Sequence, residues 1–388
     1  MAALVDGNRV TLLTSGAEYF PALEAALDAA RREIHIETYI FESDATGAAI
    51  GAALKRAAQR GVTTNVMVDG FGSSGLGAEF ISGLKEAGVN FLIFRPDVSS
   101  WSFRRTRLRR LHRKIAVVDA RVAFVGGINI IDDMHTPGHT PPRFDYAVRI
   151  EGPLVTHVHV AARRLWALVS ATQLRSGWRQ LREMGPFSAP KGGQRAAFLV
   201  RDSIRHRRDI EQAYLAAIEG ARNEIIIANA YFFPGIHFRR ALMDAAARGV
   251  RVVLLLQGRV EYVLLHYASR ALYGAFLDGG IEIHEYHRSF LHAKVAVIDG
   301  YWATVGSSNI DPFSLLLARE ANIVIEDQAF AGELRGSLVS AMSSGARRLA
   351  PQDWKRQRIW TRAMTWISYG LARLLTGLFA YGRADEFT

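Results

Sequence analysis

Two kinds of apolar pattern alternate along this chain of 388 residues, and the whole series of segments is present in two copies. In each occurrence, apolar positions three or four residues apart, typical of an amphipathic helix, lead into a short continuous apolar run, typical of a buried strand. Glycines mark the ends of several predicted helices. Helices that alternate with buried strands are typical of an α/β fold with mostly parallel sheets covered by helices.

The two occurrences match each other segment by segment. The matching segments are 24–36 and 215–227, 57–70 and 245–258, 86–94 and 278–286, 112–129 and 292–309, and 145–152 and 320–327. Each half therefore predicts strand, helix, strand, helix, strand, a hairpin and one more strand, and such a repeat predicts two copies of one fold. We predict a first half over residues 1–186, a Pro/Gly/Ser-rich linker at 187–194 and a second half over 195–345.

The predicted hairpins hold the polar residues that the two halves share. These are His112, Lys114, Asp119 and Asn129 in the first half, and His292, Lys294, Asp299 and Asn309 in the second. Because residues two apart on a strand face the same side, each histidine lies beside its lysine. The aspartates fall at the hairpin turns, where this side chain binds nearby backbone groups.

Two such hairpins around a pseudo-twofold axis would form one pocket with two imidazoles, two ammonium groups and two amides. This set suits attack on a phosphodiester: one imidazole forms a covalent phospho-enzyme, and the other donates and accepts protons. The lysines and amides stabilise the non-bridging oxygens. With two fixed cations the chemistry needs no metal, and we predict neither a metal nor a cofactor.

The duplicated pattern resembles the signature of the phospholipase D superfamily, His-x-Lys-x4-Asp-x6-Gly-Ser-x-Asn. The second copy matches it in full with Ser307, whereas the first copy has Gly127 at the position of that serine. Gly-Gly at this point, together with residues 68–73, 108–129 and 145–153, is similar to the shorter B type of bacterial cardiolipin synthase. The resemblance covers nearly the whole chain.

The resemblance implies two phospholipase D-like α-β-α halves related by a pseudo-twofold axis. It also implies transfer of a phosphatidyl group between two phosphatidylglycerol molecules, with release of glycerol. His112 would be the nucleophile and His292 the general acid and base, although the symmetry of the repeat leaves both assignments open.

In the superfamily an acidic residue downstream of each motif orients the histidine, and Asp145 and Glu320 stand at matching repeat positions. Asn129, Asn309 and Ser307 are the predicted phosphate contacts. The missing hydroxyl at Gly127 then predicts that the two halves hold the phosphate asymmetrically.

The formal net charge of +11 and the sequence pI near 10.1 predict an anionic partner: nucleic acid, an anionic membrane or a phosphorylated substrate. A basic run at 104–113 reaches His112 and favours contact with lipid head groups or a nucleic-acid backbone over a solvated surface. The absence of cysteine excludes disulfides and thiolate metal sites. We expect no signal peptide and no N-terminal membrane helix.

The tail at 346–388 combines basic residues with Trp354, Trp360 and Trp366, followed by an apolar stretch that Arg373 interrupts. This pattern predicts an amphipathic helix in the bilayer interface, with a helix packed on the domain as the alternative. We expect peripheral binding at the cytoplasmic face of the cell membrane. The expected partners are anionic phospholipid and phosphatidylglycerol, with no obligate nucleic acid or protein partner.

Three functions fit this sequence: a cardiolipin synthase, a phospholipase D hydrolase with water as acceptor, and a superfamily endonuclease. The apolar tail argues against the nuclease. The choice between transfer and hydrolysis depends on water exclusion and acceptor binding, which the sequence leaves open.

Three further features suggest chemistry less strongly. The glycine-rich segment 70–75 predicts a turn at the rim of the site, where Asp69 and Ser73 contact substrate. His157 and His159 have the spacing of a zinc pair, but without an evident third ligand a structural role is favoured. The loop at 134–143 has no counterpart in the second half and is predicted to rim the pocket.

Overall fold

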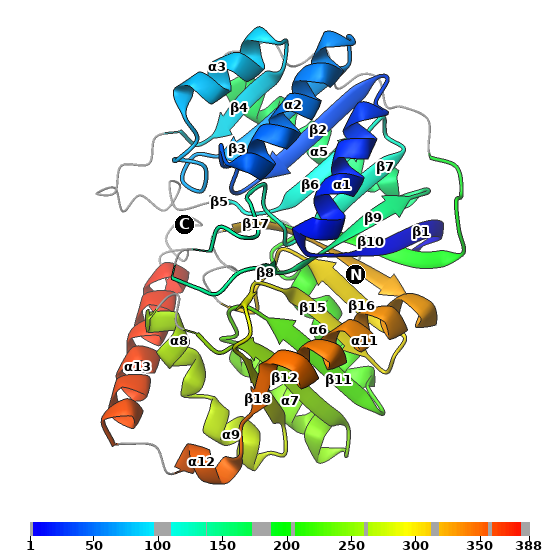
Figure 1. Cartoon of the computed structure of the whole chain (residues 1–388). Helices are drawn as coiled ribbons and strands as arrows, with labels where there is room; N and C mark the ends of the chain where they lie inside the picture. Colours follow the sequence, from blue (N-terminus) through cyan, green and yellow to red (C-terminus); the bar gives the residue numbers. More distant parts are fainter. Residues whose placement is uncertain are drawn as a thin grey trace.

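The computed structural model describes residues 3–96, 110–136, 138–172, 188–202, 206–259, 263–311, 318–355 and 359–381. Within these ranges, two similar halves lie one above the other, each with its own strands and helices (Figure 1). Residues 104–109 of the predicted basic run and residue 187 of the predicted linker lie outside the described residues.

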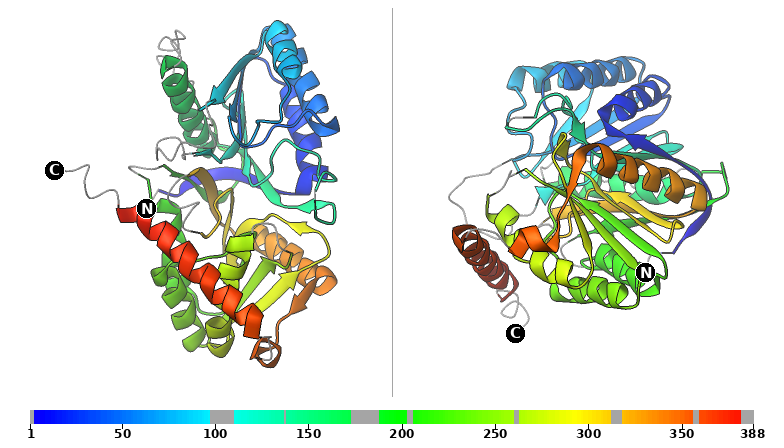
Figure 2. Two further views of the ribbon diagram at one scale, coloured as in Figure 1. Left: turned by 90° about the vertical axis from the view of Figure 1, so that its left-hand side faces the viewer. Right: turned by 60° about the horizontal axis from the view of Figure 1, so that its bottom comes forward.

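The first half follows the predicted order of elements. They are β1 (Val5–Thr14), α1 (Ser15–Asp28), β2 (Glu33–Thr38), α2 (Ala45–Gln59), β3 (Thr63–Asp69), α3 (Ala78–Glu86), β4 (Asn90–Phe94), β5 (Arg110–Leu111), β6 (Lys114–Val118), β7 (Val122–Gly126), β8 (Arg143–Phe144), β9 (Tyr146–Glu151) and α5 (Leu154–Thr172). Helices α1, α2 and α3 cover one face of the strands and α5 covers the other (Figure 2).

The second half repeats this plan. Its elements are β10 (Gln194–Arg201), α6 (Asp209–Gly220), β11 (Glu224–Asn229), α7 (Ile236–Ala247), β12 (Arg251–Gln257), α8 (Val263–Arg270), α9 (Tyr273–Asp278), β13 (Glu282–Tyr286), β14 (Phe290–Leu291), β15 (Lys294–Ile298), β16 (Trp302–Gly306), β17 (Ala318–Glu326) and α11 (Gln328–Gly345). The tail adds β18 (Ala346–Arg348), which pairs with β13, then α12 (Pro351–Lys355) and α13 (Ile359–Tyr381).

The duplicated α/β fold is as predicted, but the sheets are mixed instead of mostly parallel. In the first half β2, β3 and β4 run parallel, whereas β6, β7, β9 and β1 pair antiparallel in that order. The second half has the same arrangement around β11, β12 and β13. The physical reason is the motif hairpin, because a tight turn can join only antiparallel strands.

The two halves share one sheet and part of one core. Antiparallel pairing of β1 with β10 joins the strands of both halves into a single 16-stranded sheet among the described residues. One buried apolar cluster contains side chains of both halves, among them Val125 and Val148 from the first and Val305 and Ile323 from the second. Burial of apolar area across the junction fixes the halves relative to each other.

Helix α13 lies beside α8 on the second half (Figure 2). Thr365 and Ala372 are buried, and Tyr369 contacts Phe233 edge-on, so one face of the helix packs on the domain. The other face is apolar and exposed; its large side chains are Trp360, Met364, Trp366, Ile367, Leu371 and Leu374. None of the described helices combines the length and apolar character needed to cross a bilayer.

Candidate active site

Asp119 and Asp299 lie at the hairpin turns, away from the histidines. The Asp119 carboxylate accepts hydrogen bonds from the backbone N–H groups of residues 31, 32 and 33, and Asp299 accepts from those of residues 222, 223 and 224. Asp119 is five residue steps along the strand from Lys114, a distance of about 16 Å. We therefore correct the catalytic assignment of these aspartates to a structural one: each fixes its turn to the start of a neighbouring strand.

The two histidines lie where short strands cross from one half to the other. β5 pairs with β17, and the His112 N–H donates to the Arg319 carbonyl at 3.0 Å. β14 pairs with β8, and the His292 N–H donates to the Phe144 carbonyl at 2.8 Å. The backbone of each histidine is thus held by the opposite half.

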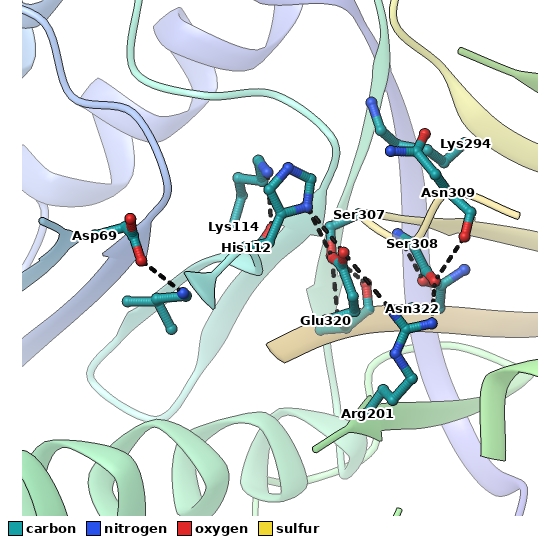
Figure 3. Close-up of polar contacts among 12 residues, drawn as sticks. Asp69, His112, Lys114, Arg201, Lys294, Ser307, Ser308, Asn309, Glu320 and Asn322 are labelled. Carbon is teal, nitrogen blue, oxygen red and sulfur yellow. Dashed lines mark hydrogen bonds and ion pairs between the residues drawn. The ribbon is translucent and has the colours of Figure 1, made fainter. Parts of the chain in front are cut away.

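The acids that orient the histidines also come from the opposite half. His112 Nδ1 lies 2.9 Å from Glu320 Oε1 (Figure 3), and His292 Nδ1 lies 2.6 Å from Asp145 Oδ2. Both carboxylates are buried, whereas the imidazoles keep 17% and 12% of their side-chain surface exposed. Because Nδ1 is bound in each ring, Nε2 is the nitrogen left for substrate.

Both lysines are buried beside their histidines. Lys114 Nζ donates to the His112 carbonyl at 2.7 Å, and Lys294 Nζ lies 2.8 Å from His292 Nδ1 and 3.6 Å from Asp145 Oδ2. The first-half ammonium also lies over the ring of Tyr39. The described residues thus bring both His–Lys pairs of the predicted site into one place.

Ser307 is fully buried and binds Glu320. Its hydroxyl is fully buried, donates to Glu320 Oε2 at 2.5 Å and accepts from the backbone N–H of Ala321 (Figure 3). We therefore correct the prediction that Ser307 contacts phosphate. Arg201, which the sequence reasoning missed, lies behind the same carboxylate, with Nη2 at 3.8 Å from Glu320 Oε1.

Gly127 occupies the position of Ser307 in the first half, and the structure explains why a serine is absent. A Cβ there would lie 2.4 Å from both carboxylate oxygens of Asp145. The shorter Asp145 thus lies against Gly127, whereas the longer Glu320 lies against Ser307. The two halves therefore differ in the acids that hold the histidines, and an asymmetric hold on the phosphate stays a prediction.

Asn129 and Asn309 follow the second strand of each hairpin and are buried. Asn129 Oδ1 accepts from the Ile40 N–H at 3.1 Å, which leaves its NH2 group as a donor. Asn309 Oδ1 is buried without a hydrogen-bond partner among the described residues.

Burial and neighbouring cations make the site electrostatically unusual. Burial lowers the pKa of His112, although Glu320 acts in the opposite direction. The pKa of His292 lies well below its usual value, because burial and the nearby charge of Lys294 both lower it. Burial lowers the pKa of Lys114 to about 7. Burial raises the pKa of Asp145. The pKa of Glu320 is lowered instead: burial raises it, but the interactions with His112 and Arg201 outweigh burial.

Asp69 and Ser73, which were predicted to contact substrate, are buried and bind backbone groups of the protein. The Asp69 carboxylate is fully buried and accepts from the N–H groups of Leu111, Phe71 and Gly72; the contact to Leu111, at 2.7 Å, holds the residue before His112. Ser73 donates to the Tyr39 carbonyl. No sequence signal marked the contacts with Leu111 and Tyr39, because they join residues 42 and 34 positions apart.

Comparison with known proteins agrees with this geometry. The family described as "Cardiolipin synthase, PLD-like domain" matches residues 23–163 and 214–340. Cardiolipin synthase B of Escherichia coli (strain K12) is 39% identical over 97% of this chain and 90% of its own length. A probable cardiolipin synthase of Bacillus subtilis (strain 168) is 30% identical over 96% of this chain and 72% of its own length.

Solved structures show the same fold at low identity. A phosphatidylserine synthase of Haemophilus influenzae has a TM-score of 0.72 at 13% identity and covers 95% of this chain and 94% of its own. A polyphosphate kinase of Porphyromonas gingivalis has a TM-score of 0.56 at 14% identity, and the match covers 96% of this chain and 53% of the kinase. With the duplicated family match and the close sequence relatives, the paired histidine motifs establish that this chain belongs to the cardiolipin synthase family of the phospholipase D superfamily.

Proposed function

We propose that this chain is a cardiolipin synthase that transfers a phosphatidyl group from one phosphatidylglycerol to another through a phosphohistidine and releases glycerol. The observation that carries the proposal is the pair of histidines whose Nδ1 atoms are each bound by a buried carboxylate of the opposite half. Neutral His112 then presents its Nε2 lone pair to phosphorus, and His292 carries a proton on Nε2 for the leaving oxygen. One site thus offers a nucleophile and a proton carrier.

In the first step, His112 Nε2 attacks the phosphorus of phosphatidylglycerol. The bond from phosphorus to the head-group glycerol oxygen breaks, and protonated His292 donates its proton to that oxygen. Free glycerol leaves, and the phosphatidyl group is bound to His112. Glu320 stabilises the positive charge that the ring gains when it bonds to phosphorus.

In the second step, neutral His292 takes the proton from a glycerol hydroxyl of the second phosphatidylglycerol. That oxygen attacks phosphorus, the phosphorus–nitrogen bond breaks, and cardiolipin forms. Lys114, Lys294 and the amide groups of Asn129 and Asn309 would hold the non-bridging oxygens in both steps.

The exposed apolar face of α13 supports a site at a membrane surface. A helix with one packed face and Trp360, Trp366 and Ile367 exposed suits the bilayer interface. We infer that the protein binds anionic membrane peripherally, at the cytoplasmic face, through this helix.

The direct test incubates the purified chain with phosphatidylglycerol vesicles and separates the lipids by chromatography. Cardiolipin and glycerol in equal amounts support the proposal. Phosphatidic acid as the sole product would make the protein a hydrolase, and nicking of plasmid without a lipid product would make it a nuclease. His157→Ala, an exposed histidine on α5, is the control for general effects of losing an imidazole.

A phosphatidyl ester of p-nitrophenol distinguishes the two histidines, because this leaving group departs without a proton donor. His292→Ala is expected to release one equivalent of nitrophenol and to retain an acid-labile phosphatidyl group. His112→Ala is expected to release none. The reverse result would exchange the two roles, and release by both variants would exclude His112 as the one required nucleophile.

A further inference from the structure

A cluster of two histidines and a glutamate lies in the first half, at the opposite end of β2 from the catalytic histidines. Glu33 and His35 are on β2, and His159 projects from α5. One ligand atom from each lies within 4.8 Å of the others. His157 is exposed and is not part of this cluster, as the sequence pattern favoured, whereas the partners of His159 come from β2.

The spacing within the cluster fits a small cation. His159 Nε2 lies 2.7 Å from Glu33 Oε1, and His35 Nε2 lies 3.2 Å from Glu33 Oε2. Ligands bound tetrahedrally to zinc at about 2.0–2.1 Å lie roughly 3.3 Å from one another, so only small shifts would bring these atoms around one ion.

The hydrogen bonding of the cluster is incomplete. His35 Nε2 bonds to Glu33, and buried His159 Nε2 forms an ion-pair contact with the same carboxylate that does not meet the geometry of a hydrogen bond. The imidazoles expose 5% and 4% of their side chains and Glu33 exposes 27%. Access from solvent is therefore through the carboxylate, while Trp166 lies edge-on to His35 within the protein.

The repeat provides an internal comparison. Asp119 binds the N–H of Glu33 as Asp299 binds that of Glu224, so the two glutamates are equivalent. Glu224 is bound by two arginines: Arg251 on β12 at 2.7 Å and Arg335 on α11 at 2.5 Å. At the matching β-ladder position Glu33 has Thr63, so no arginine comes from that strand.

His35 is the more unusual residue in this comparison. Its counterpart, two residues after Glu224, is the buried Ile226. A buried imidazole in place of an apolar side chain costs free energy unless its polar atoms are bound. Glu33 is thus contacted by two histidines, whereas the equivalent Glu224 of the other half is bound by two arginines.

We propose that Glu33, His35 and His159 bind one divalent transition-metal ion of the zinc type, which ties α5 to the start of β2. Two imidazole nitrogens and a carboxylate are the ligands that such ions accept, with a fourth position open to water on the exposed side of Glu33. In the second half Arg335 links α11 to Glu224 at the start of β11, and the ion would link α5 to Glu33 at the start of β2 in the same way. The site is separate from the catalytic one, and the proposed reaction takes no step through it.

The test uses the full chain, stripped with a chelator, loaded with zinc and desalted before the metal is counted by mass spectrometry. His35→Ile, which introduces the residue of the other half, and His159→Gln are compared with His157→Ala. We expect about one zinc per chain in the wild type and in His157→Ala, and loss of that equivalent in the other two. Zinc is expected to raise Tm only in the two proteins that retain it.

Equal zinc retention by the wild type and by folded His35→Ile and His159→Gln would overturn the proposal. Phosphatidylglycerol transfer and circular dichroism check that the variants are folded. If the variants do not fold, the visible absorption spectrum of cobalt added to the wild type tests whether the site exists. An intense visible absorption, typical of tetrahedral cobalt, supports the site, and the weak spectrum of hydrated cobalt excludes it.

Discussion

Ser307 and Gly127 occupy equivalent positions in the two halves, but the first needs a hydroxyl and the second has no room for a side chain. Ser307→Gly removes a hydroxyl that binds the ionised Glu320, and a hydrogen bond to a charged group contributes about 1.5–3 kcal/mol. We expect the rate of cardiolipin formation to fall about 10- to 150-fold. Gly127→Ser forces Asp145 away, and disturbing an orienting aspartate costs up to about 10⁴-fold.

Steady-state kinetics of the two variants check this prediction, with Tm as the measure of folding. Gly193→Ser is the control because a Cβ at Gly193 meets no atom within 4 Å. Equal activity of Gly127→Ser and the wild type would mean that Asp145 does not hold His292 during turnover.

Lys114 and His112 set the expected pH dependence. Lys114 is cationic below its pKa of about 7 and loses its charge above it, so kcat/KM should fall as pH rises through 7. His112 must be neutral to attack; because its pKa is lowered, the acid limb should lie below pH 6.5. Lys114→Arg keeps its charge and should lose the decline near pH 7 that Lys114 causes, while any decline from deprotonation of the acid His292 stays in both proteins.

The pH profile of kcat/KM for the wild type and Lys114→Arg measures both limbs, because this ratio reports the free enzyme. An alkaline limb at the same pH in the two proteins would assign that limb to another group.

At the scale of elements, the aspartate of each motif belongs to the hairpin turn. Asp119 has a φ of 53° and accepts three backbone hydrogen bonds, so Asp119→Ala loses these bonds and strains the turn. We expect the free energy of unfolding to fall by about 2–4 kcal/mol. The rate per folded molecule should change little, because the side chain lies far from the histidines.

Denaturant unfolding and kinetics on the folded fraction separate these effects. Asp244→Asn, at an exposed position of α7, is the control for removing one negative charge. Loss of turnover in stable Asp119→Ala would return this residue to the catalytic set.

Helix α13 is the element expected to hold the protein at the membrane. Trp366 is 60% exposed, and burying a large apolar side chain contributes about 1.5–3 kcal/mol. Trp366→Ser should therefore weaken binding to phosphatidylglycerol vesicles roughly tenfold or more. Co-sedimentation measures this, with Tyr301→Ser, an exposed aromatic in the β15–β16 turn, as the control. Similar losses in both variants would exclude α13 as the specific contact.

At the scale of the whole molecule, the catalytic site is formed by both halves of one chain. Each histidine is bound by an acid from the other half, and β1–β10 pairing with the shared core fixes the junction. A mixture of His112→Ala and His292→Ala chains should therefore show no more transfer than the two variants assayed separately. Recovery of activity in the mixture would indicate that the halves exchange between chains.

The sequence determined the duplication, the α/β class and the two His–Lys pairs proposed to carry the chemistry. His-x-Lys alternation and the repeat register are local properties, so His112, Lys114, His292 and Lys294 could be read from their spacing. The matching positions of Asp145 and Glu320 also marked them as partners of the histidines.

Only the tertiary structure decided which partner each residue has. The acids act across the halves, Ser307 binds Glu320, and Arg201 lies behind that acid. Glu33, His35 and His159 meet because α5 packs on β2. These contacts join segments far apart in the sequence, and they depend on chain packing, strand order and side-chain direction. Periodicity describes one segment at a time and contains none of that information.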